Sequence, residues 1–360
     1  MTARPPTQAL SSSRLGIGGD YAWDWPEAWA GHAAASLFAA GRDALAAIVA
    51  VGDSRRQDWL VPDYICTVVP DTLRRSGVSV RPYPWLSPWS VDAAGLEAAL
   101  RGATAIVVPF YMGLPPTAVI WDVLEGRSLC VVEDRCQCVG RPPAPETLRG
   151  DYAIGSFRKW LPVSDGAYCV ARRGEPPQPG PAPNRDMVRV RSAAALTKCA
   201  RLSDLPAEID RSLERAAVEL FRLGERLADR GGEGNRASGL AESVIAGCDV
   251  VAISAARVRN QAWLAARLAE KASVSVWETE PGAIAASTTP LLALPVVCSR
   301  RDEVRRKLAD GRVFCPIHWQ DGNWTGGDGR AAAWAAGQLS LPIDQRYEPA
   351  DLKRIVEALE

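Results

Sequence analysis

Short apolar runs alternate with stretches of helical periodicity along most of the chain. Apolar positions at helical spacing predict helices at 41–51, 68–77, 205–230, 250–268, 301–310 and 350–359. Apolar runs or strict alternation predict strands at 78–83, 105–109, 129–132 and 167–171. Near-continuous apolar strands that alternate with helices are typical of a mostly parallel sheet covered on both faces. The pattern therefore predicts an α/β fold.

Stretches without this periodicity suggest how the chain is divided. Residues 1–30 are rich in Gly, Pro and Trp and predict an irregular N-terminal arm, and residues 172–187 predict a surface loop. The glycine-rich stretch GGEGNRASG at 231–239 is the best candidate for a domain boundary. We therefore expect a large domain at 31–235 and a smaller C-terminal α/β domain at 236–360.

The composition narrows the class of partner. Among 360 residues, Lys+Arg and Asp+Glu number 42 each, so the formal net charge is zero and predicts neither nucleic-acid nor membrane binding. The first ten residues lack the apolar segment of a secretory signal, and the apolar runs are too short to span a bilayer. Nine cysteines are scattered, and Cys136-x-Cys138 is not a zinc spacing. We expect a reduced, cytoplasmic protein without a metal, whose partners are small molecules.

The apolar strand predicted at 129–132 runs directly into two carboxylates, Glu133 and Asp134. Ligands of open α/β sheets bind beyond the carboxyl ends of the strands, which is where Asp134 would lie. A carboxylate there can hold the proton of a pyridinium ring and keep that ring an effective electron sink. Gln137 follows three residues later and can reach the same ligand. The alternative is that Asp134 only caps the next turn.

Lysine occurs at only five positions in this arginine-rich chain, and Lys159 lies between two turn-rich segments. An amine held on such a connection and partly desolvated can form an imine with an aldehyde, which a guanidinium cannot do. The alternative is an ordinary solvated surface lysine.

A candidate phosphate site precedes both features. Gly41 opens the helix predicted at 41–51 and is followed by Arg42. The free amides and the dipole at a helix N-terminus suit a phosphate, and the Ser156 hydroxyl can add a further contact. Since many helices begin on glycine, this feature gains weight only together with the other two.

In this order, the helix-opening glycine, the strand-ending aspartate and the lysine resemble the fold-type-I pyridoxal-phosphate (PLP) enzymes, and most closely the DegT/StrS-type aminotransferases. Glu133-Asp134-Arg-Cys-Gln137 resembles the Glu-Asp-x-x-Gln segment of that family, and Lys159 stands at the position of its Schiff-base lysine. The resemblance extends over about residues 38–360. Supporting segments are Val61–Cys66, Ser164–Ala167, Phe314–Trp319 and Leu341–Tyr347.

The resemblance implies a large domain with a mostly parallel seven-stranded sheet and a role for each residue of the site. Lys159 would carry PLP, Asp134 would hold the ring nitrogen, and Gln137 would contact the ring. The implied phosphate contacts are Gly41, Arg42 and Ser156, the implied ring-covering side chain is Tyr64, and the implied substrate contacts are His318, Trp319 and Arg346.

The resemblance further implies a homodimeric aminotransferase that takes an amine donor and a polar, sugar-like acceptor in polysaccharide or specialised-metabolite biosynthesis. Two alternatives stay open. One is a PLP-dependent lyase, racemase or bond-forming enzyme acting on an amino acid. The other is a non-catalytic regulatory protein with the same fold.

Overall fold

The computed structural model describes residues 17–18, 35–52, 57–87, 89–180, 182–201, 205–230, 234–269, 271, 273–326 and 329–359. The N-terminal arm expected at 1–30 thus lies outside the described residues, except for strand β1 (Ile17–Gly18). This strand pairs in parallel with β13 (Val313–Phe314), near the other end of the chain.

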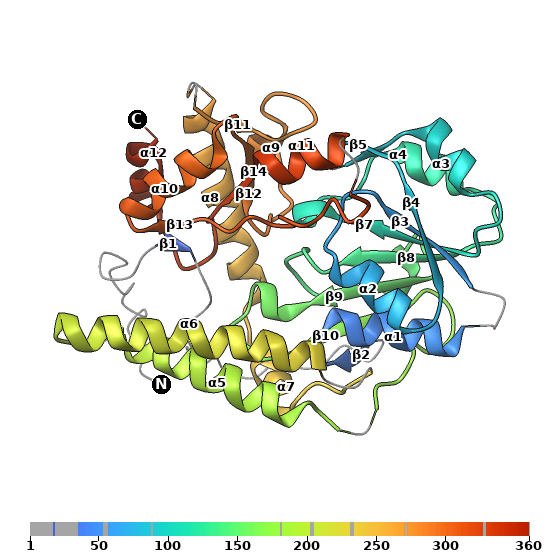
Figure 1. The fold of residues 1–360 in the computed structure, drawn as a ribbon, viewed down its shortest axis with the longest axis horizontal. Coiled ribbons are helices and arrows are strands. Elements are labelled where there is room, and N and C mark those ends of the chain that lie inside the picture. The colour runs from blue at the N-terminus through green and yellow to red at the C-terminus, as the bar shows by residue number, and fades with distance from the viewer. Residues whose placement is uncertain are drawn as a thin grey trace, which may run out of the picture.

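A seven-stranded sheet in the order β2-β10-β9-β8-β7-β3-β4 forms the centre of the fold (Figure 1). All neighbours pair in parallel except β10, which is antiparallel to both β2 and β9. The mostly parallel seven-stranded sheet is therefore confirmed. The strands span Ala35–Phe38 (β2), Asp58–Pro62 (β3), Ser79–Tyr83 (β4), Ala105–Pro109 (β7), Cys130–Arg135 (β8), Tyr152–Ser156 (β9) and Ala167–Ala171 (β10).

Helices cover both faces of this sheet, which explains why β7 and β10 are buried at every position. On one face, Ala105 and Val107 pack with apolar side chains of α1 (Gly41–Val51) and α2 (Val68–Arg75). On the other face, Ile106 and Val108 pack with α3 (Ala93–Ala99) and α4 (Ala118–Leu124). Successive residues of a strand point to opposite faces, so one apolar run serves two cores.

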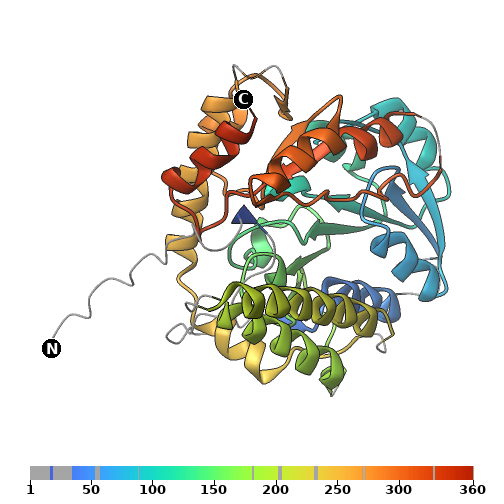
Figure 2. The ribbon, with the colours of Figure 1, turned by 60° about the vertical axis from the view of Figure 1, so that its left-hand side comes forward.

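A helical hairpin follows the sheet and partly corrects the loop expected at 172–187. Helix α5 (Arg185–Ala200) begins before that loop was expected to end, because the Asn184 side chain accepts a hydrogen bond from Met187 N (3.1 Å) and caps the helix. Helix α6 (Ala207–Arg230) confirms the helix expected at 205–230. The two helices lie side by side along one side of the molecule (Figures 1 and 2).

The remaining elements belong mainly to the C-terminal part of the chain. An antiparallel sheet contains β11 (Ser275–Val276), β12 (Leu294–Val297) and β14 (Gln338–Leu341). The helices are α7 (Gly239–Ala246), α8 (Val250–Leu268), α9 (Ala283–Ala286), α10 (Arg301–Asp310), α11 (Arg330–Gly337) and α12 (Pro349–Ala358). Earlier in the chain, two short strands, β5 (Trp85–Ser87) and β6 (Ser90–Val91), form a separate hairpin. The division into domains at residue 235 stays a prediction.

None of the described helices is by itself long and apolar enough to cross a membrane; α7 and α8 reach that threshold only as a pair bent by 72°.

Candidate functional site

A cavity of about 220 Å³ lies where the central strands end. Its wall includes the carboxyl ends of β7, β8 and β9 and the first residues of α1. This is the place where open α/β sheets bind ligands. Six of the seven residues expected to bind the cofactor line it together: Gly41, Arg42, Asp134, Gln137, Ser156 and Lys159.

The two carboxylates at the end of β8 have different surroundings because neighbouring strand residues point to opposite faces. Glu133 is fully buried and accepts hydrogen bonds from the main-chain amides of Arg149 and Gly150 (both 2.8 Å) and from Arg135 (2.7 Å). Asp134 lines the cavity, and its Oδ1 accepts a hydrogen bond from Cys136 N (3.0 Å). Glu133 thus stabilises the fold, whereas Asp134 both caps the next turn and presents a carboxylate to the cavity.

Gln137 is buried, and its side chain is only half satisfied. Its Oε1 accepts a hydrogen bond from Met112 N at 2.7 Å, whereas its Nε2 has no hydrogen-bond partner among the described residues. A buried amide without an acceptor costs about 1–3 kcal/mol, so a ligand that supplies an acceptor gains from this donor. Because Gln137 lines the cavity, this donor favours a ligand with an acceptor at that point.

Lys159 ends the short helix η3 (Phe157–Lys159), which directly follows β9. The lysine is partly buried and lines the cavity, and within the described part of the chain its amine makes no hydrogen bond or ion pair. Burial and the nearby Asp134 charge raise the pKa of the neighbouring Cys136 thiol far above its usual value, so that thiol stays protonated. Of these two groups, Lys159 is the better candidate for a nucleophile at the cavity.

The first residues of α1 form one end of the cavity, and the N-cap residue of this helix, Ala40, makes no capping hydrogen bond from a side chain. A Cβ on Gly41 would lie 2.6 Å from Cys136 Sγ, so glycine is what allows α1 to approach the end of β8 so closely. Ser156 lies near the same end, because it pairs with Ala167, which in turn pairs with Phe38, three residues before Gly41. Arg42 and Arg158 add positive charge. We call this end of the cavity, formed by Gly41, Arg42, Ser156 and Arg158, the anion end.

Tyr64 does not line the cavity, contrary to the expectation that it covers a ligand ring there. It is buried behind Trp319, with ring centroids 5.5 Å apart, and its hydroxyl donates to the main-chain carbonyl of His318 (3.3 Å). Cys66 and Phe110 occupy the cavity wall instead. Cys66 follows Tyr64 by two positions, and the path of the loop after β3 selects the later residue.

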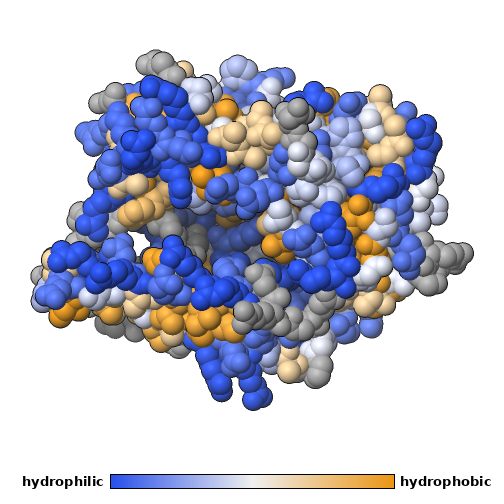
Figure 3. All heavy atoms as spheres, viewed as in Figure 1, coloured by the Kyte–Doolittle hydropathy of each residue, from blue (hydrophilic) through white to orange (hydrophobic). Residues whose placement is uncertain are grey.

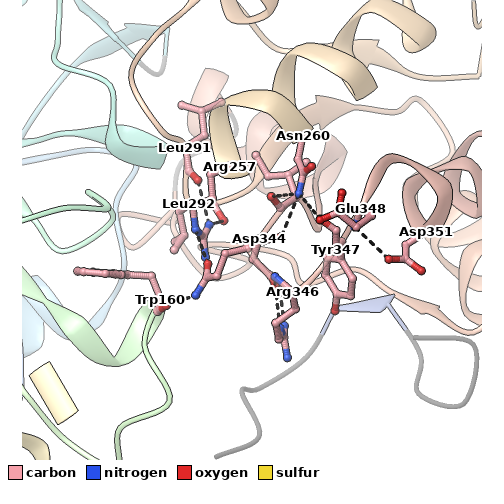
Figure 4. Close-up of polar contacts among 12 residues, drawn as sticks. Trp160, Arg257, Asn260, Leu291, Leu292, Asp344, Arg346, Tyr347, Glu348 and Asp351 are labelled. Carbon is pink, nitrogen blue, oxygen red and sulfur yellow. Dashed lines mark hydrogen bonds and ion pairs between the residues drawn. The ribbon is translucent and has the colours of Figure 1, made fainter. Parts of the chain in front are cut away.

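Of the three residues expected to contact substrate, one lines the cavity and two do not. Trp319 lines the cavity in a left-handed conformation (φ 60°) and packs against Tyr111, with ring centroids 4.8 Å apart. His318 points away, its Nδ1 2.7 Å from Ser340 Oγ, and burial together with the Lys159 charge lowers its pKa to about 3. Arg346 makes a bidentate ion pair with Asp344 (both contacts 2.8 Å; Figure 4) and does not line the cavity. The geometry thus favours a structural ion pair for Arg346 over a substrate contact.

Sequence reasoning missed several side chains of the cavity wall. Arg158 is adjacent to Lys159, and Phe110 follows a predicted strand, so position along the chain could have suggested both. Glu225, in contrast, is not near any predicted site residue or predicted strand end in the sequence. It lies in α6, more than sixty residues after Lys159, and only the docking of the α5–α6 hairpin brings it to the cavity.

Comparisons with known proteins gave likenesses of structure alone. No protein-family model matches the sequence, and no curated protein matches it. Among solved structures, a DegT DnrJ EryC1 StrS aminotransferase from Brucella abortus matches with a TM-score of 0.60 and 16% identity, over 90% of this chain and 84% of that one. PseC of Helicobacter pylori, an aminotransferase involved in the biosynthesis of pseudoaminic acid, matches with a TM-score of 0.60 and 11% identity, over 98% and 88%.

A third match differs in the reaction that its name states. The E. coli GDP-4-keto-6-deoxy-D-mannose-3-dehydratase, solved with bound hydrated PLP, matches with a TM-score of 0.60 and 12% identity, over 91% of this chain and 87% of that one. At such identities the likeness extends to the fold and not to the reaction. The chain therefore has the fold-type-I architecture of the DegT/StrS-type aminotransferases, as its sequence motifs led us to expect.

Proposed function

We propose that the protein is a PLP-dependent aminotransferase that transfers an amino group from an amine donor to a polar, sugar-like acceptor. The observation that carries the proposal is the convergence of Asp134, Gln137 and Lys159 with the anion end around one cavity. These groups come from separate segments of the chain, and together they match the ring nitrogen, ring substituents, aldehyde and phosphate of one cofactor.

The residues present fit PLP. The unpartnered Nε2 of Gln137 offers a hydrogen bond to an acceptor on the ring. The N-terminus of α1, which the absence of a side chain on Gly41 lets approach the end of β8, suits a phosphate, as do the guanidinium groups of Arg42 and Arg158. Asp134 supplies a carboxylate for the protonated ring nitrogen.

When bound, PLP supplies an electron sink for carbanion chemistry at the substrate carbon. In the proposed role, the Lys159 amine holds the cofactor and then moves a proton as general base and acid. Asp134 keeps the ring nitrogen protonated, and the anion end holds the phosphate in place between half-reactions. Phe110 also lines the cavity, and the Arg135 guanidinium lies over its ring, 4.3 Å from the ring centroid.

Reductive trapping tests the cofactor assignment. Protein purified with PLP should be yellow, and borohydride treatment should leave a pyridoxyl group on the peptide that contains Lys159. Lys198, on α5 and outside the cavity wall, is the matched lysine that should stay unmodified. A modification at Lys198, or none at any lysine, would refute the assignment.

The type of reaction needs its own experiment, because the fold also occurs in a dehydratase. Glutamate should convert the bound cofactor to pyridoxamine phosphate, with release of 2-oxoglutarate, and a keto sugar should restore the original spectrum. If amino acids change the spectrum without forming pyridoxamine phosphate, the lyase-type alternative is correct.

The proposal includes a homodimer. Its support is the exposed apolar surface of the α5–α6 hairpin, where Leu196, Ile209 and Val218 are 53%, 48% and 43% exposed. Hydrophobic side chains also gather along the lower edge of this hairpin in Figure 3. Sedimentation equilibrium measures the assembly state directly, and a monomer at micromolar concentration would contradict this part of the proposal.

A further inference from the structure

A carboxylate occupies the cation-rich end of the cavity. Glu225, carried by α6, lines the cavity with Arg42 and Arg158. Its Oε1 lies 2.9 Å from Arg158 Nη1 and 2.7 Å from Arg191 Nη2. The Arg158 guanidinium that would serve a bound phosphate is therefore already paired with an internal anion. The face shown in Figure 3 is hollowed just above the hairpin that carries this residue.

The charges around Glu225 keep it ionised. Burial alone would raise the pKa of this carboxyl, but the guanidinium groups of Arg158, Arg191 and Arg42 together lower it below its usual value. The side chain is nevertheless 47% exposed, so water reaches it and the carboxylate can leave its partners. Arg191, in contrast, is buried and also donates to the main-chain carbonyl of Ser164 (3.1 Å), so its position does not depend on Glu225 alone.

We propose that Glu225 is an internal counter-ion of the anion end, which a phosphate-bearing ligand must displace from Arg158. The identity of that ligand as PLP rests on the proposed function, whereas competition for Arg158 rests on the contacts themselves. A phosphate that reaches Arg158 Nη1 competes with Glu225 for this donor, and the two like charges repel each other. Glu225 thus weakens the binding of the phosphate group and leaves the binding of the pyridine ring unaffected.

A different role for Glu225 would be to orient Arg158 for the phosphate. The two roles predict opposite effects of Glu225→Gln, which keeps an oxygen that accepts from Arg158 but removes the charge. A competitor, once neutralised, lets phosphate bind more tightly. A positioning group, once neutralised, leaves phosphate binding unchanged or weaker.

The experiment compares Glu225→Gln with Glu219→Gln, using calorimetric titration. Glu219 lies on the same helix, is exposed and pairs with Arg222 at 2.6 Å outside the cavity wall, so its variant has the same change of net charge. Inorganic phosphate, PLP and pyridoxal, which lacks the phosphate, are the probes. We expect Glu225→Gln to bind phosphate and PLP about two- to fivefold more tightly, the ratio that corresponds to a partly exposed ion pair. Pyridoxal binding and the Glu219→Gln variant should be unchanged.

Unchanged or weaker phosphate binding by Glu225→Gln would overturn the proposal, as would an equal gain for pyridoxal. Should this variant fail to fold, Glu225→Asp shortens the side chain and draws the carboxylate back from Arg158 and Arg191 together, because one oxygen contacts both, and phosphate should again bind more tightly. The titration with inorganic phosphate decides the inference even if PLP proves not to be the cofactor. Absence of PLP binding to every variant would refute the proposed function alone.

Discussion

Gln345 donates its side-chain amide to the main-chain carbonyl of Trp160, the residue after Lys159, at 2.8 Å. The same glutamine accepts a hydrogen bond from Arg257 Nε (2.8 Å), and Arg257 is buried on α8 with further contacts to the carbonyls of Leu291 and Leu292 (Figure 4). Groups from the C-terminal part of the chain therefore fix the peptide that follows the proposed cofactor lysine.

This contact predicts that Gln345→Ala lowers both stability and cofactor retention. The change leaves the Arg257 Nε without this acceptor and the Trp160 carbonyl without this donor, which should cost about 1–3 kcal/mol of unfolding free energy. Chemical denaturation measures the first effect, and the rate of PLP loss during dialysis measures the second. Gln178→Ala removes an exposed glutamine whose amide donates to the Pro176 carbonyl, and should change neither quantity. Equal PLP loss from Gln345→Ala and wild type would show that the contact does not position Lys159.

Asp134→Asn should preserve the fold and abolish most turnover. The amide oxygen of asparagine can still accept from Cys136 N, but it cannot hold a proton on the ring nitrogen. We expect turnover with an amine donor to fall at least about a hundredfold, as for the loss of a main electrostatic contact in other active sites. Asp122→Asn, at an exposed position of α4, is the control. Full activity of Asp134→Asn would remove this carboxylate from the mechanism.

Gly41→Ala should destabilise the protein through a single defined clash. The new Cβ would lie 2.6 Å from Cys136 Sγ, and overpacking of this kind costs about 1–3 kcal/mol. The double variant Gly41→Ala/Cys136→Ala should recover most of that loss, because the sulfur is gone. Thermal unfolding of wild type, both single variants and the double variant measures the coupling, and strictly additive effects would disprove the clash.

A variant at a second glycine, Gly239, serves as the control for Gly41→Ala. Gly239 likewise begins a helix, α7, but among the described residues no atom outside its chain neighbours and its own helix lies within 4 Å of the point that a Cβ would occupy there. Gly239→Ala should therefore be tolerated in the same thermal unfolding experiment.

His318 should make the cofactor-free protein less stable as the pH falls from 7 to 5. Its pKa is lowered to about 3 in the folded chain, so below pH 6.5 the unfolded chain binds a proton that the folded chain does not. The contribution of His318 to the free energy of unfolding is thus fully present above pH 6.5 and is lost progressively as the pH falls toward 3. The loss at pH 5 is at most about 2 kcal/mol.

Denaturation of wild type and His318→Gln at several pH values tests the direction in which stability changes with pH. The stability advantage of wild type over His318→Gln should shrink between pH 7 and 5. Ser340→Ala removes the hydroxyl 2.7 Å from His318 Nδ1 but retains the buried imidazole, so it should keep the pH dependence of wild type. A constant difference between wild type and His318→Gln would contradict the lowered pKa.

Features that depend on local pattern could be predicted from the amino-acid sequence. The apolar strand that carries Asp134 near its end, the helix opening on Gly41 and the helices at 250–268 and 301–310 all follow from spacing within a single segment. Strand β9 and helix α5 were missed for the same reason. Strand β9 is a five-residue segment, YAIGS, that contains a glycine, and α5 has arginines between its apolar residues, so neither presents a clear period.

Which side chains meet at the cavity depends, in contrast, on how the elements pack in three dimensions. The path of the loop after β3 places Cys66 on the wall and Tyr64 behind Trp319, and Arg346 turns to Asp344 instead of the cavity. The docking of the α5–α6 hairpin brings Glu225 to Arg158 across 67 positions of sequence. Such contacts depend on how whole elements pack against one another. A shift of one residue in a loop, or a few degrees in a helix, changes the partner while the local pattern of the sequence stays the same.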